Sequence, residues 1–166
     1  MHRRLHSLGH LARRDPQLVI LAVQVYVLLL VMRGVIRALP LRRITQHLGV
    51  AAQEVPSGAL SPEQLRYARR VGWTIEKLAP HTPTNSNCYP QALTARWLLH
   101  RRRIASTVFY GAAFEPGRPA LQTHVWLRAG PLVVTGGSPG RSFQALSWFT
   151  DVPAQRRASR RYRAWA

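Results

Sequence analysis

The chain contains a single cysteine, Cys88, and a His-x-Trp sequence, His124-Val125-Trp126, follows it 36 residues later. A thiolate is a strong nucleophile, and a neutral imidazole can accept and return the proton that attack on a carbonyl requires. Turn-forming residues precede Cys88 and an amphipathic segment follows it, so we expect the cysteine to open a helix, where backbone N–H groups favour a thiolate. The pattern predicts a cysteine nucleophile with His124 as its base, and Trp126 as a wall that excludes water.

Helices and strands are expected in separate parts of the chain. Ser61-Pro62-Glu63-Gln64 has the residues of a capping box with proline at the first helical position. Helices are expected at about 18–32, 41–48, 61–78 and 88–102, with a further short helix at 143–149, and strands at 104–112, 121–127 and 132–135. A hairpin turn at Ala129-Gly130 joins the last two strands, and Arg96 and His100 of the helix at 88–102 are expected to lie outward. Helices followed by an antiparallel sheet indicate an α+β fold, in which the helix that begins at Cys88 packs on the face of the strand that carries His124.

Composition limits the classes of function. The 166 residues contain 24 basic and six acidic residues, a formal net charge of +18, and all the basic residues except Lys77 are arginine. Such a chain attracts nucleic acid, acidic peptides and anionic lipid. The arginines are scattered rather than arranged in a recognition motif, so no specific nucleic-acid partner is predicted.

The single thiol excludes an internal disulfide and a zinc site built from several cysteines, and it suits a reducing cytoplasm. His2, His6 and His10 recur at helical spacing, but no cysteine or carboxylate joins them, so no metal or other cofactor is predicted.

An apolar run at residues 18–32 is shorter than the roughly 20 residues that a membrane-spanning helix needs. A buried or partner-docking helix is therefore favoured, and membrane association through these residues is the alternative. The expected organisation is a basic arm with an apolar helix at 1–49, a catalytic core at 50–153 and a basic tail at 154–166.

Three sequence blocks resemble one family. N-C-Y-P-Q-A-L at 87–93, followed by W-L-L-H-R-R-R-I at 97–104, resembles the C-L-x-R-A-L…L-L-x-R-R-G-I block of lasso-peptide leader peptidases, which are bacterial transglutaminase-like cysteine proteases. Q-T-H-V-W-L at 122–127 resembles their A-H-A-W-V/L block. L-P-L-R-R at 39–43, with L-G at 48–49, resembles their L-P-x-R-R…L-G sequence.

The resemblance implies a papain/transglutaminase-like fold and a function. Members of this family remove the leader peptide from a ribosomally made lasso-peptide precursor and need no cofactor. The chain resembles the protease half of a split enzyme, which implies a small winged-helix-like leader-binding protein and an ATP-dependent lasso cyclase as partners.

The chain also departs from the family pattern. The return strand, which often carries an acidic residue in the family, here reads V-T-G-G at 134–137. The group that orients His124 is therefore left open between a backbone carbonyl, Thr135 and Asp151. An oxyanion would be bound by the backbone N–H of Cys88 and one side-chain donor, with Asn87 and Gln91 as candidates.

Two other functions remain open from the sequence. The same thioester could pass its acyl group to an amine instead of water. Alternatively, the chain could be a basic protein that binds nucleic acid or an anionic membrane without catalysis.

Overall fold

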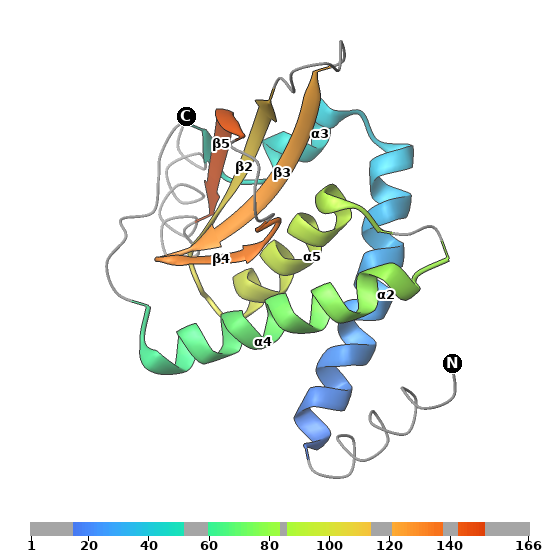
Figure 1. Cartoon of the computed structure of the whole chain (residues 1–166), viewed down its shortest axis with the longest axis vertical. Coiled ribbons are helices and arrows are strands. Elements are labelled where there is room, and N and C mark those ends of the chain that lie inside the picture. Colours follow the sequence, from blue (N-terminus) through green and yellow to red (C-terminus); the bar gives the residue numbers. More distant parts are fainter. Residues whose placement is uncertain (1–14, 52–59, 84–85, 114–120, 138–142, 152–166) are drawn as a thin grey trace, which may run out of the picture.

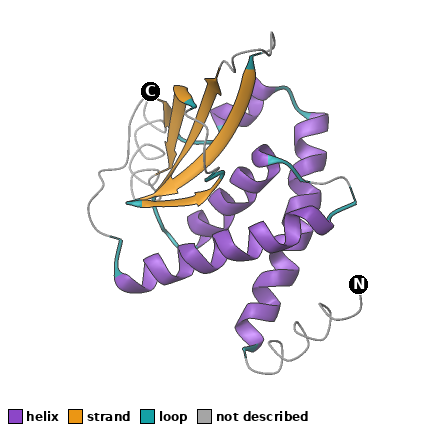
Figure 2. Cartoon of the chain, in the orientation of Figure 1, coloured by secondary structure: helices purple, strands orange, loops and turns teal. Residues whose placement is uncertain are grey.

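The computed structural model describes residues 15–51, 60–83, 86–113, 121–137 and 143–151 (Figure 1). The helices are α2 (Pro16–Ala38), α3 (Leu41–Gln46), α4 (Pro62–Leu78) and α5 (Cys88–Arg101), with a 3-10 turn η1 (Ala79–His81). The strands are β1 (Val50–Ala51), β2 (Ser106–Ala113), β3 (Gln122–Ala129), β4 (Leu132–Thr135) and β5 (Gln144–Asp151). The predicted α+β class is confirmed (Figure 2). The tail at 154–166 and the arm that carries His2, His6 and His10 lie outside the described residues.

The strands form one antiparallel sheet in the order β1-β5-β2-β3-β4. The central strand β2 pairs with β3 on one side and β5 on the other. β3 and β4 form the predicted hairpin, with Gly130 in its turn at a φ of 53°. β4 pairs only with residues 127–129, so the first half of β3 lies beyond the end of β4, at the margin of the sheet.

The last strand corrects a prediction, because residues 143–149 were expected to form a short helix. Instead they contribute most of β5, which pairs along the open edge of β2. Phe149 meets Tyr110 edge to face on one side of the sheet, with ring centroids 5.9 Å apart, and Trp148 lies 6.4 Å from Phe109 on the other. Pairing with a distant strand satisfies the backbone groups, and it outweighs the local sequence pattern.

The helices stack in two layers on one face of the sheet. α5 contacts β2, β3 and β4, α4 contacts β4, and α2 crosses α4 and α5 on the side away from the strands (Figure 1). A single core joins these layers. Its largest fully buried side chains include Val25, Leu29, Ile75, Leu98, Leu99, Val108 and Leu127.

The helix starts follow local chemistry. Ser61 Oγ accepts from the Gln64 backbone N–H at 3.2 Å, and Gln64 Oε1 accepts from the Ser61 N–H at 2.9 Å, which is the predicted capping box. α2 is longer than the apolar run, because Asp15 caps it and Pro16 occupies its first turn. By length and composition α2 could cross a membrane, a test that core helices and signal sequences also pass.

α5 is fixed to β2 by an aromatic contact at its first turn. The rings of Tyr89 and Tyr110 meet edge to face, with centroids 5.6 Å apart. Burial raises the pKa of both phenols above the ordinary tyrosine value of about 10.

We expect Tyr110→Phe to make the protein more resistant to alkaline unfolding. The unfolded chain loses the two phenol protons at lower pH than the folded protein. The stability that the neutral phenols contribute is therefore complete below about pH 10 and is lost as the pH rises further, and Tyr110→Phe removes one of these phenols. Tyr67→Phe is the control, because it removes a half-buried phenol whose ring lies beneath Arg102 and not against a second tyrosine. Circular dichroism against pH should show a higher unfolding midpoint for Tyr110→Phe alone, and an unchanged midpoint would contradict this origin of alkaline instability.

Candidate active site

Cys88 is the first residue of α5, as predicted. Asn87 is the N-cap residue with extended backbone, and its exposed side chain makes no capping hydrogen bond. Since first-turn N–H groups have no partner within their helix, those of Cys88 and Tyr89 can bind an anion here. Pro90 has no N–H to leave unpaired. Cys88 is a half-buried free thiol at the edge of the core. Its backbone is therefore suited to binding an oxyanion, whereas Asn87 as a second donor stays a prediction.

The loop before Cys88 is held by hydroxyl groups. Thr82 Oγ1 donates to the Ala79 carbonyl at 2.8 Å and accepts from the Ser86 N–H at 3.0 Å. Gln91 Nε2 donates to the Ser86 carbonyl at 2.7 Å. Gln91 therefore braces the chain that leads into Cys88, and its expected role as an oxyanion donor stays a prediction. Thr82 and Ser86 were not predicted as supports, although hydroxyl residues between two helices commonly make such local bonds.

His124 is oriented by a backbone carbonyl, one of the three alternatives that the sequence left open. Its Nε2 lies 2.8 Å from the Gly136 carbonyl oxygen, and because that oxygen can only accept, Nε2 carries the proton. In the neutral ring Nδ1 then has a lone pair and can act as a base. The ring stacks on Phe143 at 4.7 Å and lies 6.1 Å from Trp126, centroid to centroid.

Gly136 can be no other residue without strain. Its φ is +77°, and a Cβ here would lie 2.6 Å from the Trp126 Cβ and 2.7 Å from the Val125 carbonyl oxygen. The carbonyl that holds His124 therefore depends on this glycine. The V-T-G-G sequence contains a signal for this position, because a glycine pair directly follows the strand.

The second alternative, Thr135, does not orient the histidine. Its side chain is buried, it pairs with Leu127 across the hairpin, and its hydroxyl has no hydrogen-bond partner within the described residues. Trp126 shares a face of β3 with His124 and stacks on Phe109 at 5.3 Å. The Trp126 ring also lies over Gly111, where a Cβ would be only 2.6 Å away. Trp126 therefore lies beside His124, and its role as a wall that excludes water stays a prediction.

The face of β3 that α5 covers was predicted wrongly. Val125, Leu127 and Ala129 point into the core beneath the helices, so the alternation of the strand places His124 and Trp126 on the opposite face. The physical reason is that the aliphatic side chains gain more from burial than an imidazole and an indole do.

Cys88 and His124 are therefore not joined by a hydrogen bond in the described part of the chain. They lie at a similar level along the sheet, however. The neighbour of Cys88, Tyr89, contacts Tyr110, and the next residue of β2, Gly111, pairs with His124. Joint action of Cys88 and His124 stays a prediction.

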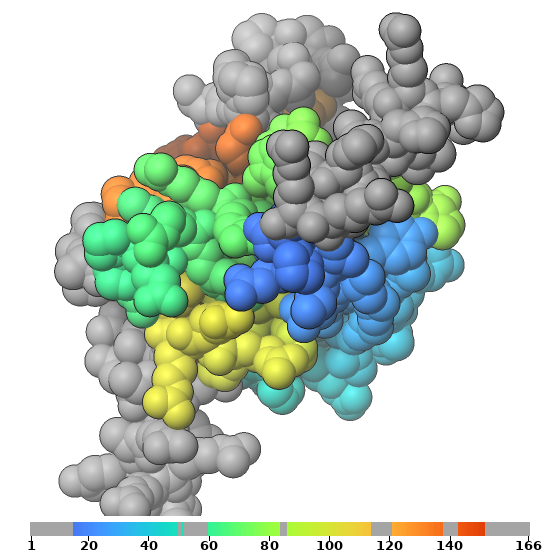
Figure 3. Space-filling model, turned by 90° about the horizontal axis from the view of Figure 1, so that it is seen from below, coloured from blue at the N-terminus to red at the C-terminus, as the bar shows by residue number. Residues whose placement is uncertain are grey.

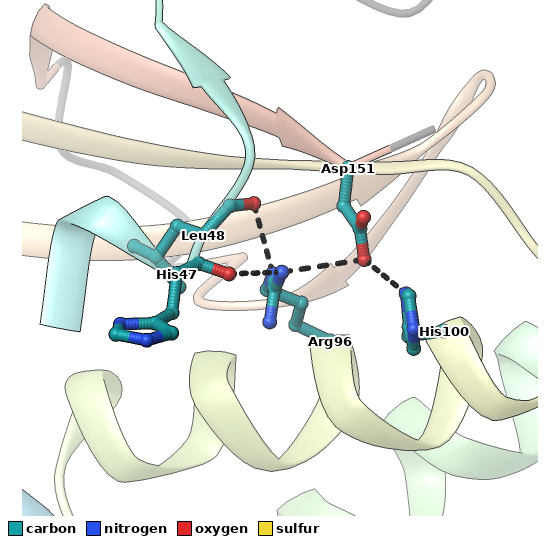
Figure 4. Close-up of polar contacts among 5 residues, drawn as sticks. All are labelled: His47, Leu48, Arg96, His100 and Asp151. Carbon is teal, nitrogen blue, oxygen red and sulfur yellow. Dashed lines mark hydrogen bonds and ion pairs between the residues drawn. The ribbon is translucent and has the colours of Figure 1, made fainter. Parts of the chain in front are cut away.

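Asp151, the third alternative, belongs to a different cluster. It pairs with Ser106 at the far end of β2, five residues from the Gly111 that faces His124, or about 17 Å along a strand. Asp151 is 1% exposed, and its Oδ2 accepts from His100 Nδ1 at 2.6 Å and lies 3.3 Å from an Arg96 nitrogen (Figure 4). The expectation that Asp151 could orient His124 is corrected by this position.

Arg96 joins three elements at this cluster. From α5 it donates to the Leu48 carbonyl at 3.0 Å and the His47 carbonyl at 2.6 Å, beyond the end of α3, while it contacts Asp151 of β5 (Figure 4). Arg96 and His100 were expected to point into solvent. Arg96 and His100 instead anchor the C-terminal half of α5, which begins at Cys88. Among the described residues, no cluster of histidine, cysteine and carboxylate side chains could hold a metal ion.

The fold and these residues define a class: an α+β protein whose sole cysteine opens a helix packed on an antiparallel sheet that carries a histidine. The model of the transglutaminase-like superfamily matches residues 29–147, so the chain belongs to this superfamily. The match contains both Cys88 and His124 and ends before Asp151. It begins within α2, so it crosses the predicted boundary between 1–49 and 50–153, and that division stays a prediction. No curated protein and no solved structure matches the chain significantly.

We expect Gly136→Ala to disturb His124 specifically. The new Cβ would clash with the β3 backbone and force a left-handed conformation on alanine, at a cost of at least about 1 kcal/mol, which lowers the melting temperature by about 2–4 °C in a chain of this size. Gly137→Ala is the matched control, since its Cβ would meet only Val133 at 3.6 Å. Nitrogen NMR of the His124 ring should show loss of the Nε2–H tautomer in the first variant only, and an unchanged spectrum would contradict the role of Gly136.

Removing the charge of Asp151 should destabilise the fold strongly. Asp151→Asn leaves Arg96 without its buried anion, and breaking a buried pair costs about 3–5 kcal/mol. Asp15→Asn is the control, because the Asp15–Arg70 pair is 40% exposed at both side chains, a setting worth under about 1 kcal/mol. Urea unfolding should separate the two variants clearly, and equal losses would show that the Asp151 cluster is not an anchor.

Proposed function

We propose that the chain is a cysteine peptidase that removes the leader peptide from a ribosomally synthesised lasso-peptide precursor. It would work with a separate leader-binding protein and an ATP-dependent cyclase. The observation that carries the peptidase proposal is the position of Cys88, the only cysteine, at the first turn of α5 within a transglutaminase-like domain. This superfamily includes cysteine peptidases. The lasso-specific part rests on the sequence blocks at 39–49, 87–104 and 122–127.

In the proposed reaction His124 Nδ1 takes the proton of the Cys88 thiol. The resulting thiolate attacks the carbonyl carbon of the scissile peptide bond, while the carbonyl electrons move onto oxygen. The first-turn N–H groups of α5 stabilise this oxyanion. The C–N bond then breaks, and protonated His124 gives its proton to the departing amine. The leader remains on Cys88 as a thioester. Water attacks this thioester as His124 takes up its proton, the C–S bond breaks, and the leader leaves with a free carboxyl group.

This reaction requires His124 Nδ1 to approach Cys88 from the other face of β3. Two features support such an approach when substrate binds. The segment that carries His124 extends beyond β4, at the margin of the sheet, and His124 lies three residues before Leu127, the first residue of β3 that pairs with β4. Catalytic hydrogen bonds are often long in free enzymes and form fully only in the substrate complex.

The partners follow from the same proposal. Within the described residues, the helices and strands pack around one sheet, and none of them forms a separate unit for leader recognition. A separate leader-binding protein would present the precursor, and the net charge of +18 would attract an acidic leader or partner.

The test is cleavage of the precursor encoded beside this gene, with the leader-binding protein present. We expect the full chain to release leader with a free carboxyl group and Cys88→Ala to release none, because no other residue of this chain can form the thioester. Ser147→Ala, at an exposed position of β5, is the control and should cleave normally. Mass spectrometry of the products provides the measurement. Full cleavage by Cys88→Ala would reject the peptidase proposal, and a leader that carries an added amine would replace hydrolysis with acyl transfer.

A further inference from the structure

α2 is apolar on two faces, and the described part of the chain covers only one of them. Leu21, Val25 and Leu29 are buried against α4 and α5. The opposite face carries Ile20 at 59% exposure, Val23 at 59%, Val27 at 50% and Val31 at 49%. We call these four residues the α2 stripe. Their spacing of three, four and four residues keeps them on one side of a helix, so they form a continuous apolar surface.

The charges around the α2 stripe have one sign. Residues 16–53 contain four arginines and no acidic residue. Arg37, Arg42 and Arg43 are exposed where α2 ends and α3 begins. At the other end of α2, Asp15 is paired with Arg70 at 2.6 Å. Whatever covers the stripe must therefore accept apolar side chains and carry negative charge beside them.

We propose that α2 docks on an anionic membrane and lies in the plane of its interface. The α2 stripe would enter the boundary between headgroups and acyl chains, and the arginines at the α2–α3 junction would contact lipid phosphates. A second copy of the chain fits this surface less well, because it would bring a second net charge of +18 against the first. An anionic bilayer is complementary in both polarity and charge.

A flat orientation also follows from the packing of α2. To span the bilayer, α2 would have to withdraw Leu21, Val25 and Leu29 from the core. These side chains would regain an apolar environment in the bilayer, but the apolar side chains of α4 and α5 that they cover would be exposed to water. Each such exposure costs about 1.5–3 kcal/mol, so spanning would cost the fold a large part of its typical stability. Lying flat uses only the face that is already exposed.

This surface is independent of the proposed peptidase site. Ile20, Val23 and Val27 precede residue 29, where the superfamily match begins. In the view from below, α2 (dark blue) runs into α3 (cyan) along the outside of the molecule (Figure 3). α2 makes its helix contacts with α4 and α5 and lies away from the strands.

The test is sedimentation of the full chain with vesicles. One set contains phosphatidylcholine alone, and the other contains equal parts of phosphatidylcholine and phosphatidylglycerol, at low and high salt. We expect binding to the anionic vesicles and little to the neutral ones. The variant Val23→Gln/Val27→Gln keeps the net charge and should bind at least about tenfold more weakly, because it removes two valines that would be buried in the bilayer.

The matched control is Val133→Gln/Leu146→Gln, which changes two exposed residues of β4 and β5, 45% and 65% accessible, and should bind like the wild type. Cys88→Ala should also bind normally, so this result does not depend on peptidase activity. The proposal would be overturned if the wild type sedimented with the neutral vesicles and not with the anionic ones. It would also be overturned if Val23→Gln/Val27→Gln bound the anionic vesicles as well as the wild type does. Analytical ultracentrifugation without lipid adds one further outcome: a wild-type dimer that the α2 variant abolishes would assign the stripe to a second copy instead.

Discussion

The packing of α5 on the sheet is the constraint on which the rest of this structure depends. Its first turn is fixed by the contact of Tyr89 with Tyr110, and its C-terminal half by Arg96 and His100 on the buried carboxylate of Asp151. Between these anchors, Ala92, Leu93 and Ala95 are buried. Because both ends are held, the first residue of the helix, Cys88, has a defined position at the edge of the core.

The same packing determines the orientation of β3. Burial of Val125 and Leu127 beneath the helices places His124 on the other face, where an aromatic layer surrounds it. The Gly136 carbonyl then fixes its tautomer with a lone pair on Nδ1. This transglutaminase-like domain holds a half-buried thiol at a helix N-terminus and a histidine of defined tautomer on opposite faces of one sheet, and the proposed chemistry requires substrate to bring them together.

Local signals in the sequence predicted much of this fold. The capping box at Ser61, the helix that begins at Cys88 and the hairpin turn at Gly130 each depend on residues close in sequence, and each was found as expected. β5 could not be predicted, because its strand form depends on pairing with β2, more than thirty residues earlier.

The candidate site was harder to predict for the same reason. The cluster of Arg96, His100 and Asp151 joins positions about fifty residues apart, so spacing alone gave no reason to expect Arg96 and His100 to contact a buried carboxylate. The face of β3 was missed because alternation shows which residues share a side, but not which side the helix covers. The carbonyl that orients His124 was among the predicted options, although its dependence on Gly136 required coordinates.

The central claim is that Cys88 and His124 act on one peptide bond, and trapping the covalent intermediate tests it most directly. The full chain, its precursor and the leader-binding protein would be mixed, quenched in acid and weighed intact by mass spectrometry. The account predicts the leader acyl group on wild-type Cys88, and its formation slowed by about 10²-fold or more in His124→Ala. Leader release at the wild-type rate by His124→Ala, with no acylated Cys88 at any time, would contradict it.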